Sequence, residues 1–244
     1  MFKTIAIDVN NTIINTNLTL QRLHSKLAHY KVLKTVFKTL PINKKSFKKA
    51  FKEFASTKNF CLQTNANINM FYKDLASFIG LKPSKLQIKQ LSEEFYNAFS
   101  KQAFLYPGSK NFLTWTKKHG LSLWVVTDWP LQLVINVLES KKISHYFEGF
   151  LTSDLFGLKK TLKPFKAFLD KAGTEPKHSL MISSFEQDNN CRKLGIRFLL
   201  IKRKHLKHYK KTFIADGKAS SMLQAPKTIQ ELEKKTYNLI PDYL

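Results

Sequence analysis

A short apolar run near the start of the chain leads into polar side chains whose types suit attack on an electrophile. The run Thr4 to Ile7 is followed by Asp8, Asn10, Asn11 and Thr12. An aspartate carboxylate can act as a nucleophile and form a covalent intermediate, and a nearby hydroxyl can hold substrate oxygens. Asn10 is an amide, so it cannot exchange a proton as a carboxylate does. These residues predict a nucleophilic site in which a proton-handling carboxylate is replaced.

Polar residues with complementary chemistry follow three further apolar runs. They are Thr127 and Asp128 after Val126, Lys159 and Lys160 after the run 150–152, and Ser183, Ser184 and Asp188 after Ile182. A lysine and a hydroxyl can stabilise charge on phosphoryl oxygens. Mg²⁺ usually takes one or two carboxylates and water as ligands. Asp8 and Asp188 are the candidate metal ligands, and with this pair alone a Mg²⁺ site would be incomplete.

The apolar runs predict strands that alternate with helices. Strands are expected at about 3–9, 121–126, 150–152, 179–182 and 197–201. Helices are expected at 109–118, 131–140, 164–172 and 229–235, with another that ends at Leu194. This alternation indicates a parallel sheet. Because ligands bind beyond the carboxyl ends of such strands, the polar residues above should meet at one edge of the sheet.

Residues 17–102 have helical periodicity throughout. Apolar residues recur at helical spacing from Leu18 to Tyr30, and further helices are expected at about 44–54, 67–79 and 85–100. We therefore predict an α/β fold with a Rossmann-like parallel-sheet core from residues 1–15 and 103–244. An all-helical unit, residues 16–102, is inserted into this core.

The order of these motifs resembles the haloacid dehalogenase (HAD) superfamily over nearly the whole chain. The family's first motif, Asp-x-Asp-x-Thr after an apolar strand, is similar to Asp8 to Thr12, and its second, a Ser or Thr that closes a strand, is similar to Thr127. Its third motif is a lysine, for which Lys160 is the first choice and Lys159 the second. The resemblance implies that Asp8 is the nucleophile and that residues 16–102 form a helical cap, which in the family closes over the site and selects the substrate.

Two positions depart from the phosphatases of that family. Asn10 stands where the phosphatases have the aspartate that acts as general acid and base. Ser183 and Ser184 stand where their fourth motif has Gly-Asp, whose aspartate contributes to the Mg²⁺ site. The resemblance to a phosphatase is therefore incomplete at the proton donor and at the metal.

The metal-independent dehalogenases of the family match in part. Their fourth motif, Ser-Ser-Asn-x-x-Asp, is similar to Ser183, Ser184 and Asp188, but Phe185 replaces its Asn. In addition, Asn10 replaces a tyrosine in the first motif, and Asp128 replaces the Asn after the second. The chain is complete for neither chemistry.

The charge of the chain is strongly positive. Lys and Arg number 41 and Asp and Glu 17, so the net charge is +24. A surface of this kind attracts phosphate polymers and anionic membranes. A compositional preference for Lys, Asn and Phe is the alternative explanation. The candidate nucleic-acid contacts lie in two basic stretches: Lys44, Lys45, Lys48, Lys49 and Lys52, and Lys202, Arg203, Lys204, Lys207, Lys210 and Lys211.

Bulk features restrict the class of protein further. No run approaches 18 consecutive apolar residues, so no membrane span is expected. No signal peptide is apparent, and the two widely separated cysteines, Cys61 and Cys191, predict a reducing compartment. We expect the protein in the cytoplasm or an organelle matrix and not outside the cell.

Two hypotheses for function follow. The first, favoured by Asn10, Ser183-Ser184 and the charge of +24, is a degenerate HAD-like protein that has lost catalysis. It would bind an anionic partner such as structured RNA in a ribosome-like ribonucleoprotein, without a cofactor. The alternative is an active hydrolase, either a phosphatase or dehalogenase-like, that uses Asp8 on a small anionic substrate.

Overall fold

A computed structural model describes residues 1–16, Thr19, 28–57, 68–159, 161–203, Leu206 and 214–237. Six parallel strands form one sheet: β1 (Thr4–Ile7), β2 (Ser122–Val126), β3 (Gly149–Leu151), β4 (Ser179–Ser183), β5 (Arg197–Ile201) and β6 (Gly217–Ala219). Their order is β3-β2-β1-β4-β5-β6. The predicted α/β class with a Rossmann-like parallel-sheet core is confirmed.

The central strand β1 lies between β2 and β4. Ile7 at its end is in register with Val125 of β2 and with Ile182 of β4. The residues that follow these three strands therefore leave the sheet at the same level. This register brings the first, second and fourth polar clusters to one edge, as the parallel arrangement predicts.

The two faces of the sheet are covered by different helices. Ile5 and Ile7 face a core shared with α6 (Ser109–Lys118), α7 (Leu131–Ser140) and α10 (Ala225–Tyr237). Ala6 faces the other way, toward α9 (Lys163–Ala172) and the 3-10 helix η4 (Glu186–Leu194). Short 3-10 turns also occur at Ser144–Tyr146 (η2) and Pro176–His178 (η3). Side chains alternate across a strand, so runs such as Leu-Trp-Val-Val are apolar on both sides because both faces are covered.

Three elements of the sheet core differ from the sequence-based prediction, and the first is the one-turn helix α8 (Ser153–Phe156), which is too short to show a helical periodicity. The strand β6, Gly-Lys-Ala, was not expected, because it is short and has no apolar run. The segment before Leu194 is a 3-10 helix and not an α-helix. Its residues Glu186 to Asn190 are polar, and Asp and Asn side chains compete for the backbone hydrogen bonds of a regular helix.

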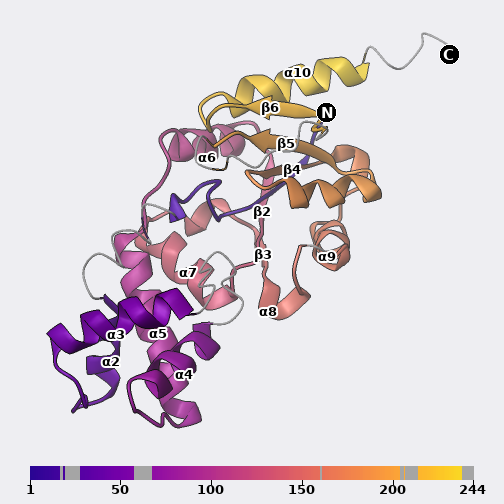
Figure 1. Cartoon of the computed structure of the whole chain (residues 1–244). Helices are drawn as coiled ribbons and strands as arrows, with labels where there is room; N and C mark the ends of the chain where they lie inside the picture. The colour runs from indigo at the N-terminus through magenta and orange to yellow at the C-terminus, as the bar shows by residue number, and fades with distance from the viewer. Residues whose placement is uncertain are drawn as a thin grey trace.

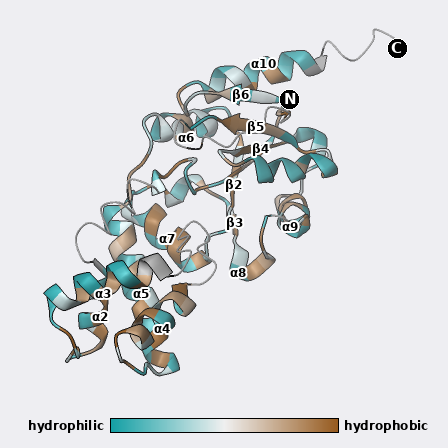
Figure 2. Ribbon diagram, viewed as in Figure 1, coloured by the Kyte–Doolittle hydropathy of each residue, from teal (hydrophilic) through white to brown (hydrophobic). Residues whose placement is uncertain are grey.

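Four described helices from the segment predicted to be inserted gather at one end of the molecule (Figure 1). They are α2 (Ala28–Val36), α3 (Lys44–Thr57), α4 (Ile68–Phe78) and α5 (Lys85–Gln102). The stripe of Phe47 and Phe54 on α3 is buried, as its spacing predicts, while the outer side of α3 is hydrophilic (Figure 2). The boundaries of the insert at 16 and 102 stay a prediction.

An aromatic contact joins this helical group to the sheet core. Phe99 of α5 packs edge-on against Trp129, which follows β2, with ring centroids 5.4 Å apart. Nearby, Asn136 Nδ2 of α7 donates to Asn97 Oδ1 at 3.0 Å, and Ser140 Oγ donates to the carbonyl of Ser100 at 2.8 Å. The described helices include none long and apolar enough to cross a membrane.

We predict that Phe99→Ala lowers the free energy of unfolding by about 3–5 kcal/mol, because it leaves a cavity beneath Trp129. Chemical denaturation measures this loss. Leu86→Ala on the same helix is the control, since Leu86 is 65% exposed and its loss should cost under about 1 kcal/mol. Equal costs for the two variants would contradict the prediction.

Candidate active site

Asp8 lies at the carboxyl end of β1 and is fully buried. Its backbone N–H donates to the carbonyl of Ile182 at 3.0 Å, which continues the pairing of β1 with β4 by one residue. The carboxylate therefore has a rigid backbone and lies between the ends of β2 and β4. This is the position that the strand order predicts for a nucleophile.

One ammonium group joins Asp8 to a second buried carboxylate. Lys159 Nζ forms an ion pair with Asp8 Oδ1 at 2.9 Å and a hydrogen bond with Asp188 Oδ2 at 2.6 Å. Ser183 Oγ also donates to Asp188 Oδ2, at 2.5 Å. The four residues come from the first, third and fourth motifs, so the tertiary structure assembles them into one charged cluster.

The backbone around Lys159 directs its side chain inward. Lys159 follows α8 (Ser153–Phe156) and Gly157, whose φ of 81° lies in the left-handed region that favours glycine. The N–H of Lys159 donates to Asp128 Oδ1 at 2.7 Å. The side chain is 1% exposed. Lys160, the first choice from the sequence, lies outside the described residues. Lys159, the second choice, is the lysine that forms the ion pair with Asp8.

Hydroxyl groups from the segments that follow β1 and β2 surround Asp8. Thr12 Oγ1 lies 3.4 Å from Asp8 Oδ2 and accepts a hydrogen bond from the N–H of Ser184 at 2.9 Å. Thr127, buried at the end of β2, also contacts Asp8. Thr12 and Thr127 thus lie where hydroxyls can orient the carboxylate and a substrate oxygen.

The turn after β1 has a conformation that suits its asparagine. Asn11 has a φ of 52°, and its Oδ1 accepts a hydrogen bond from the N–H of Thr16 at 3.1 Å. Asn tolerates the left-handed region better than most residues because its short amide can bond locally. Asn10, just before it, has a buried Oδ1 with no hydrogen-bond partner among the described residues. That oxygen can accept a hydrogen bond from a substrate or from water, although the amide cannot take up the proton.

Burial and charge set the protonation states of the cluster. Burial raises the pKa of Asp8, against the opposing effect of the Lys159 ammonium. Burial also raises the pKa of Asp188, to about 6, again partly offset by Lys159. Burial alone would lower the pKa of Lys159, but the carboxylates of Asp188 and Asp8 outweigh it and raise the pKa. Lys159 is therefore a permanent cation near neutral pH.

The residues at this site do not fit the carboxylate set of a Mg²⁺ ion. Both candidate ligands, Asp8 and Asp188, are within ion-pair distance of Lys159 Nζ, which would repel a divalent cation. Ser184, which stands where the resemblance places a metal-binding aspartate, has its N–H bonded to Thr12. No group of three His, Cys, Asp or Glu side chains in the described ranges could hold a metal ion.

One residue assigned to nucleic-acid contact from the sequence lies in the interior instead. Arg203 is 7% exposed, and its guanidinium bonds the carbonyls of Asn11 and Thr12. This corrects the prediction, because the side chain is engaged by the loop beside Asp8. Lys202 is exposed, and the other basic residues of that stretch, Lys204, Lys207, Lys210 and Lys211, lie outside the described residues.

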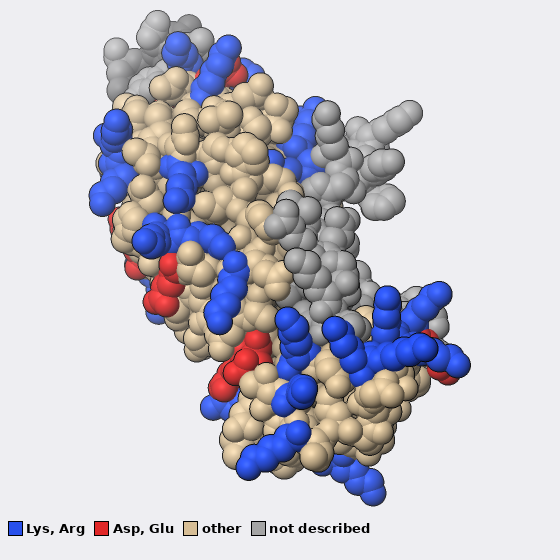
Figure 3. All heavy atoms as spheres, turned by 90° about the vertical axis from the view of Figure 1, so that its left-hand side faces the viewer, with Lys and Arg blue, Asp and Glu red and all other residues tan. Residues whose placement is uncertain are grey.

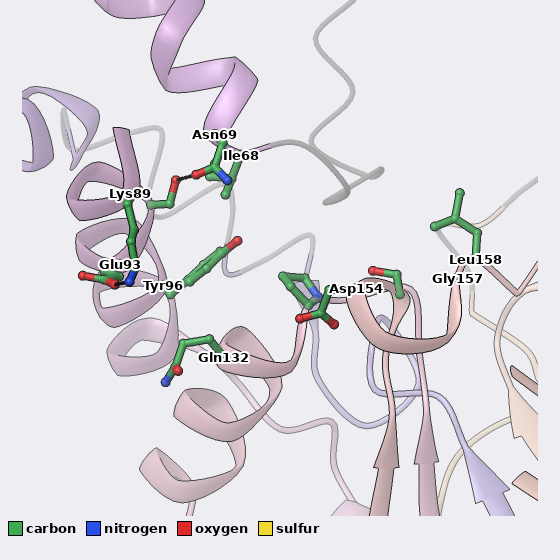
Figure 4. Close-up of a pocket in the computed structure, with 12 residues that line it drawn as sticks. Ile68, Asn69, Lys89, Glu93, Tyr96, Gln132, Asp154, Gly157 and Leu158 are labelled. Atoms are coloured by element: carbon green, nitrogen blue, oxygen red, sulfur yellow. Dashed lines mark hydrogen bonds and ion pairs between the residues drawn. The ribbon is translucent and has the colours of Figure 1, made fainter. Parts of the chain in front are cut away.

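A cavity of about 590 Å³ lies between the helical group and the sheet core, next to the loop that carries Lys159. Tyr96 of α5 and Ile68 of α4 line one side, and Asp154 and Leu158 line the other (Figure 4). Burial and the Asp154 carboxylate raise the pKa of Tyr96 to about 12, so its phenol stays a neutral donor. Asp8 does not line this cavity. The sequence gave no sign of Ile68 and Tyr96 as part of a site, since they meet Asp154 and Leu158 only through packing.

We predict that Lys159→Met lowers the free energy of unfolding by about 3–5 kcal/mol at pH 7, because two buried carboxylates lose their counter-charge. Without the ammonium, the folded-state pKa values of both acids rise further above their unfolded values. The folded variant then binds more protons than the unfolded chain, so its stability should recover as the pH falls toward 5. Denaturation curves at several pH values measure this.

Lys163→Met, at an exposed position in α9, is the matched control and should cost under about 1 kcal/mol. A loss in Lys159→Met that does not depend on pH would contradict the assigned charges.

Comparison with known proteins gives a family and a fold. A family model described as haloacid dehalogenase-like hydrolase matches residues 5–201. The phosphoglycolate phosphatase of Aliivibrio fischeri is 30% identical over 101 residues, which span 41% of this chain and 44%, less than half, of that protein.

Two crystal structures share the fold at low sequence identity. A HAD phosphatase from Thermococcus onnurineus has a TM-score of 0.66 and 17% identity, and the comparison covers 93% of this chain and 98% of that one. A 2-haloacid dehalogenase from Pseudomonas syringae has a TM-score of 0.63 and 16% identity, with 95% and 99% covered. Because the family model spans most of the 244 residues, from the first strand to the fifth, the protein belongs to the haloacid dehalogenase-like hydrolase family.

Proposed function

We propose that the protein is a hydrolase in which Asp8 attacks a small anionic substrate and Lys159 supplies the positive charge at the site. The observation that carries this proposal is the position of Lys159 Nζ, 2.9 Å from Asp8 and 2.6 Å from Asp188. A fixed cation in a buried site stabilises negative charge more strongly than it would in water. Asp188, which Ser183 holds by a hydrogen bond, binds the ammonium from the other side, so Lys159 stays in place when the Asp8 carboxylate reacts.

Asn10 limits the kinds of leaving group that the site can release. An alkoxide leaving group, as in a phosphate monoester, needs a proton, and the amide of Asn10 cannot give one. A halide leaves as a stable anion without a proton. The site therefore suits displacement at a carbon that carries such a leaving group, in a small carboxylic acid. Phosphate monoesters are the alternative, in line with the name of the Aliivibrio fischeri relative.

The proposed reaction has two steps. An Asp8 carboxylate oxygen forms a bond to the substrate carbon, and the carbon–halogen bond breaks with its electron pair leaving on the halide. Water then attacks the resulting ester, which restores the Asp8 carboxylate and releases a hydroxy acid and a proton. The ammonium of Lys159 balances the carboxylates before the first step and after the second.

Family membership and the assembled cluster favour this proposal over the non-catalytic hypothesis. The sequence suggested loss of catalysis from Asn10 and Ser183-Ser184. In the structure, however, Ser183 bonds Asp188 at 2.5 Å, and the N–H of Ser184 bonds Thr12 at 2.9 Å. Residues 183 and 184 thus both bond other residues of the site. Serines at these positions therefore do not indicate that catalysis has been lost.

We predict that the protein turns over a member of a panel of 2-halo acids and phosphate monoesters, and that Asp8→Asn lowers kcat at least about 10³-fold. Release of halide or phosphate is the measurement. Asp170→Asn, an exposed change of the same type on α9, should leave turnover unchanged. EDTA should have no effect on the wild type.

The outcomes separate the parts of the proposal. No turnover across the panel contradicts a hydrolase of these substrate classes. Turnover that Mg²⁺ restores after EDTA contradicts the role given to Lys159, while leaving Asp8 as nucleophile.

A second candidate function is binding of a polyanion such as structured RNA. Five lysines of α3 are exposed, Lys44, Lys45, Lys48, Lys49 and Lys52, and the only acid of that helix is Glu53. Lysines at this spacing repel one another, so the helix bears an electrostatic cost that a polyanion would remove. Basic side chains also extend over the rest of the face in Figure 3, where acids are few.

We predict that the triple variant Lys45→Glu, Lys48→Glu and Lys52→Glu weakens binding of an RNA hairpin at least about tenfold and flattens its salt dependence. Titrations at two salt concentrations measure both. The control reverses three exposed lysines of α6, Lys110, Lys117 and Lys118. Equal losses in the two variants would mean that only net charge matters and would remove α3 from the hypothesis.

A further inference from the structure

Three contacts hold the guanidinium of Arg203 against the loop that follows β1. Its Nε donates to the carbonyl of Asn11 at 2.9 Å, and its Nη2 donates to the carbonyl of Thr12. Its Cζ lies 3.6 Å from the ring centroid of Tyr106. The side chain is 7% exposed. Arg203 follows β5, so a residue nearly 200 positions away supports the loop after β1.

An arginine suits this place for a physical reason. Its planar group presents donors in a rigid fork, so two carbonyls that are adjacent in the chain can be bound at once, and it stacks on aromatic rings. A lysine has a single ammonium group on a flexible stem and cannot reproduce both contacts with the same geometry. Burying the charge carries a desolvation cost, which two carbonyls and the ring of Tyr106 offset.

The two bound carbonyls belong to the loop that places the Thr12 hydroxyl against the Asp8 carboxylate. Thr12 Oγ1 lies 3.4 Å from Asp8 Oδ2 and accepts from the N–H of Ser184. Asn11, with its φ of 52°, directs the chain back toward Thr16. If the carbonyls moved, the Thr12 hydroxyl would move with them, and Asp8 would lose a neighbour that orients it.

We infer that Arg203 is a positioning residue, which holds the loop of Asn11 and Thr12 so that the Thr12 hydroxyl stays against Asp8. The inference rests on the proposed function for its catalytic consequence, but the restraint on the loop is independent of it. The inference gives Arg203 a role inside the protein, whereas its neighbour Lys202 is exposed and available to a partner in solution.

Amide hydrogen exchange tests the restraint without an activity assay. The amides of Ile13 and Ile14 bond the carbonyl of Val9 and report on the loop, while those of Asp8 and Thr127 report on the sheet. In Arg203→Met, exchange at Ile13 and Ile14 should be at least about tenfold faster, with Asp8 and Thr127 unchanged. Lys202→Met removes a positive charge from the neighbouring position and should leave the exchange rates of both pairs of amides unchanged. Faster exchange at all four amides, or at none, overturns the inference.

Arg203→Lys serves if the methionine variant does not fold. It keeps the charge and loses one carbonyl contact, so exchange at Ile13 and Ile14 should still be several-fold faster than in the wild type. Exchange equal to that of the wild type would overturn the two-carbonyl role.

Kinetics then test the catalytic consequence. With the panel substrate that the wild type turns over, Arg203→Met should lower kcat about tenfold or more with little change in KM. The kcat of Arg203→Lys should lie between those of Arg203→Met and the wild type. Unchanged kcat alongside a loosened loop would overturn the link to Asp8. No turnover by the wild type would count against the proposed function alone, because the exchange result stands separately.

Discussion

Two fully buried carboxylates of this protein lie beside a single ammonium group, and the geometry around the end of β1 depends on that contact. Lys159 is within ion-pair distance of both Asp8 and Asp188. Buried charges without partners cost several kcal/mol each, so the cluster is stable only if all three groups are present and close. The same requirement brings three chain segments together: the loop after β1, the loop after α8 and the start of η4. The same three charged groups therefore hold these segments together and form the proposed catalytic site.

The loop after β1 is held from two further directions. The N–H of Ser184 after β4 bonds the hydroxyl of Thr12, and Arg203 after β5 bonds the carbonyl of the same residue. These contacts come from neighbouring strands of the parallel sheet, whose ends lie at one level. A short turn with an asparagine at positive φ can be rigid when it is bound on both sides. Rigidity of this kind is what a nucleophile needs, since misplacement by about 1 Å can lower a rate about 10²-fold.

The sequence predicted the architecture better than it predicted the site. Apolar runs gave the places of β1, β2, β4 and β5, because burial on both faces requires continuous apolar residues. β6 was missed, since a three-residue edge strand carries no such signal. Lys159 and Lys160 could not be distinguished from their types. Lys159 is at Asp8 because Asp128 binds its N–H and Gly157 turns the chain before it. Arg203 was assigned to a basic surface, because its neighbours in the sequence are basic.

By itself the sequence determined the family, the alternation of strands and helices and the presence of Asp8 at a strand end, because these follow from local periodicity and from motif order. It also showed that Asn10 cannot handle a proton, which depends only on the chemistry of an amide. Only the tertiary structure decided which lysine meets the two acids, that Ser183 and Ser184 support the site, and that Arg203 is buried. Those facts are contacts between residues far apart in the chain, and they depend on distances and orientations that no local pattern encodes.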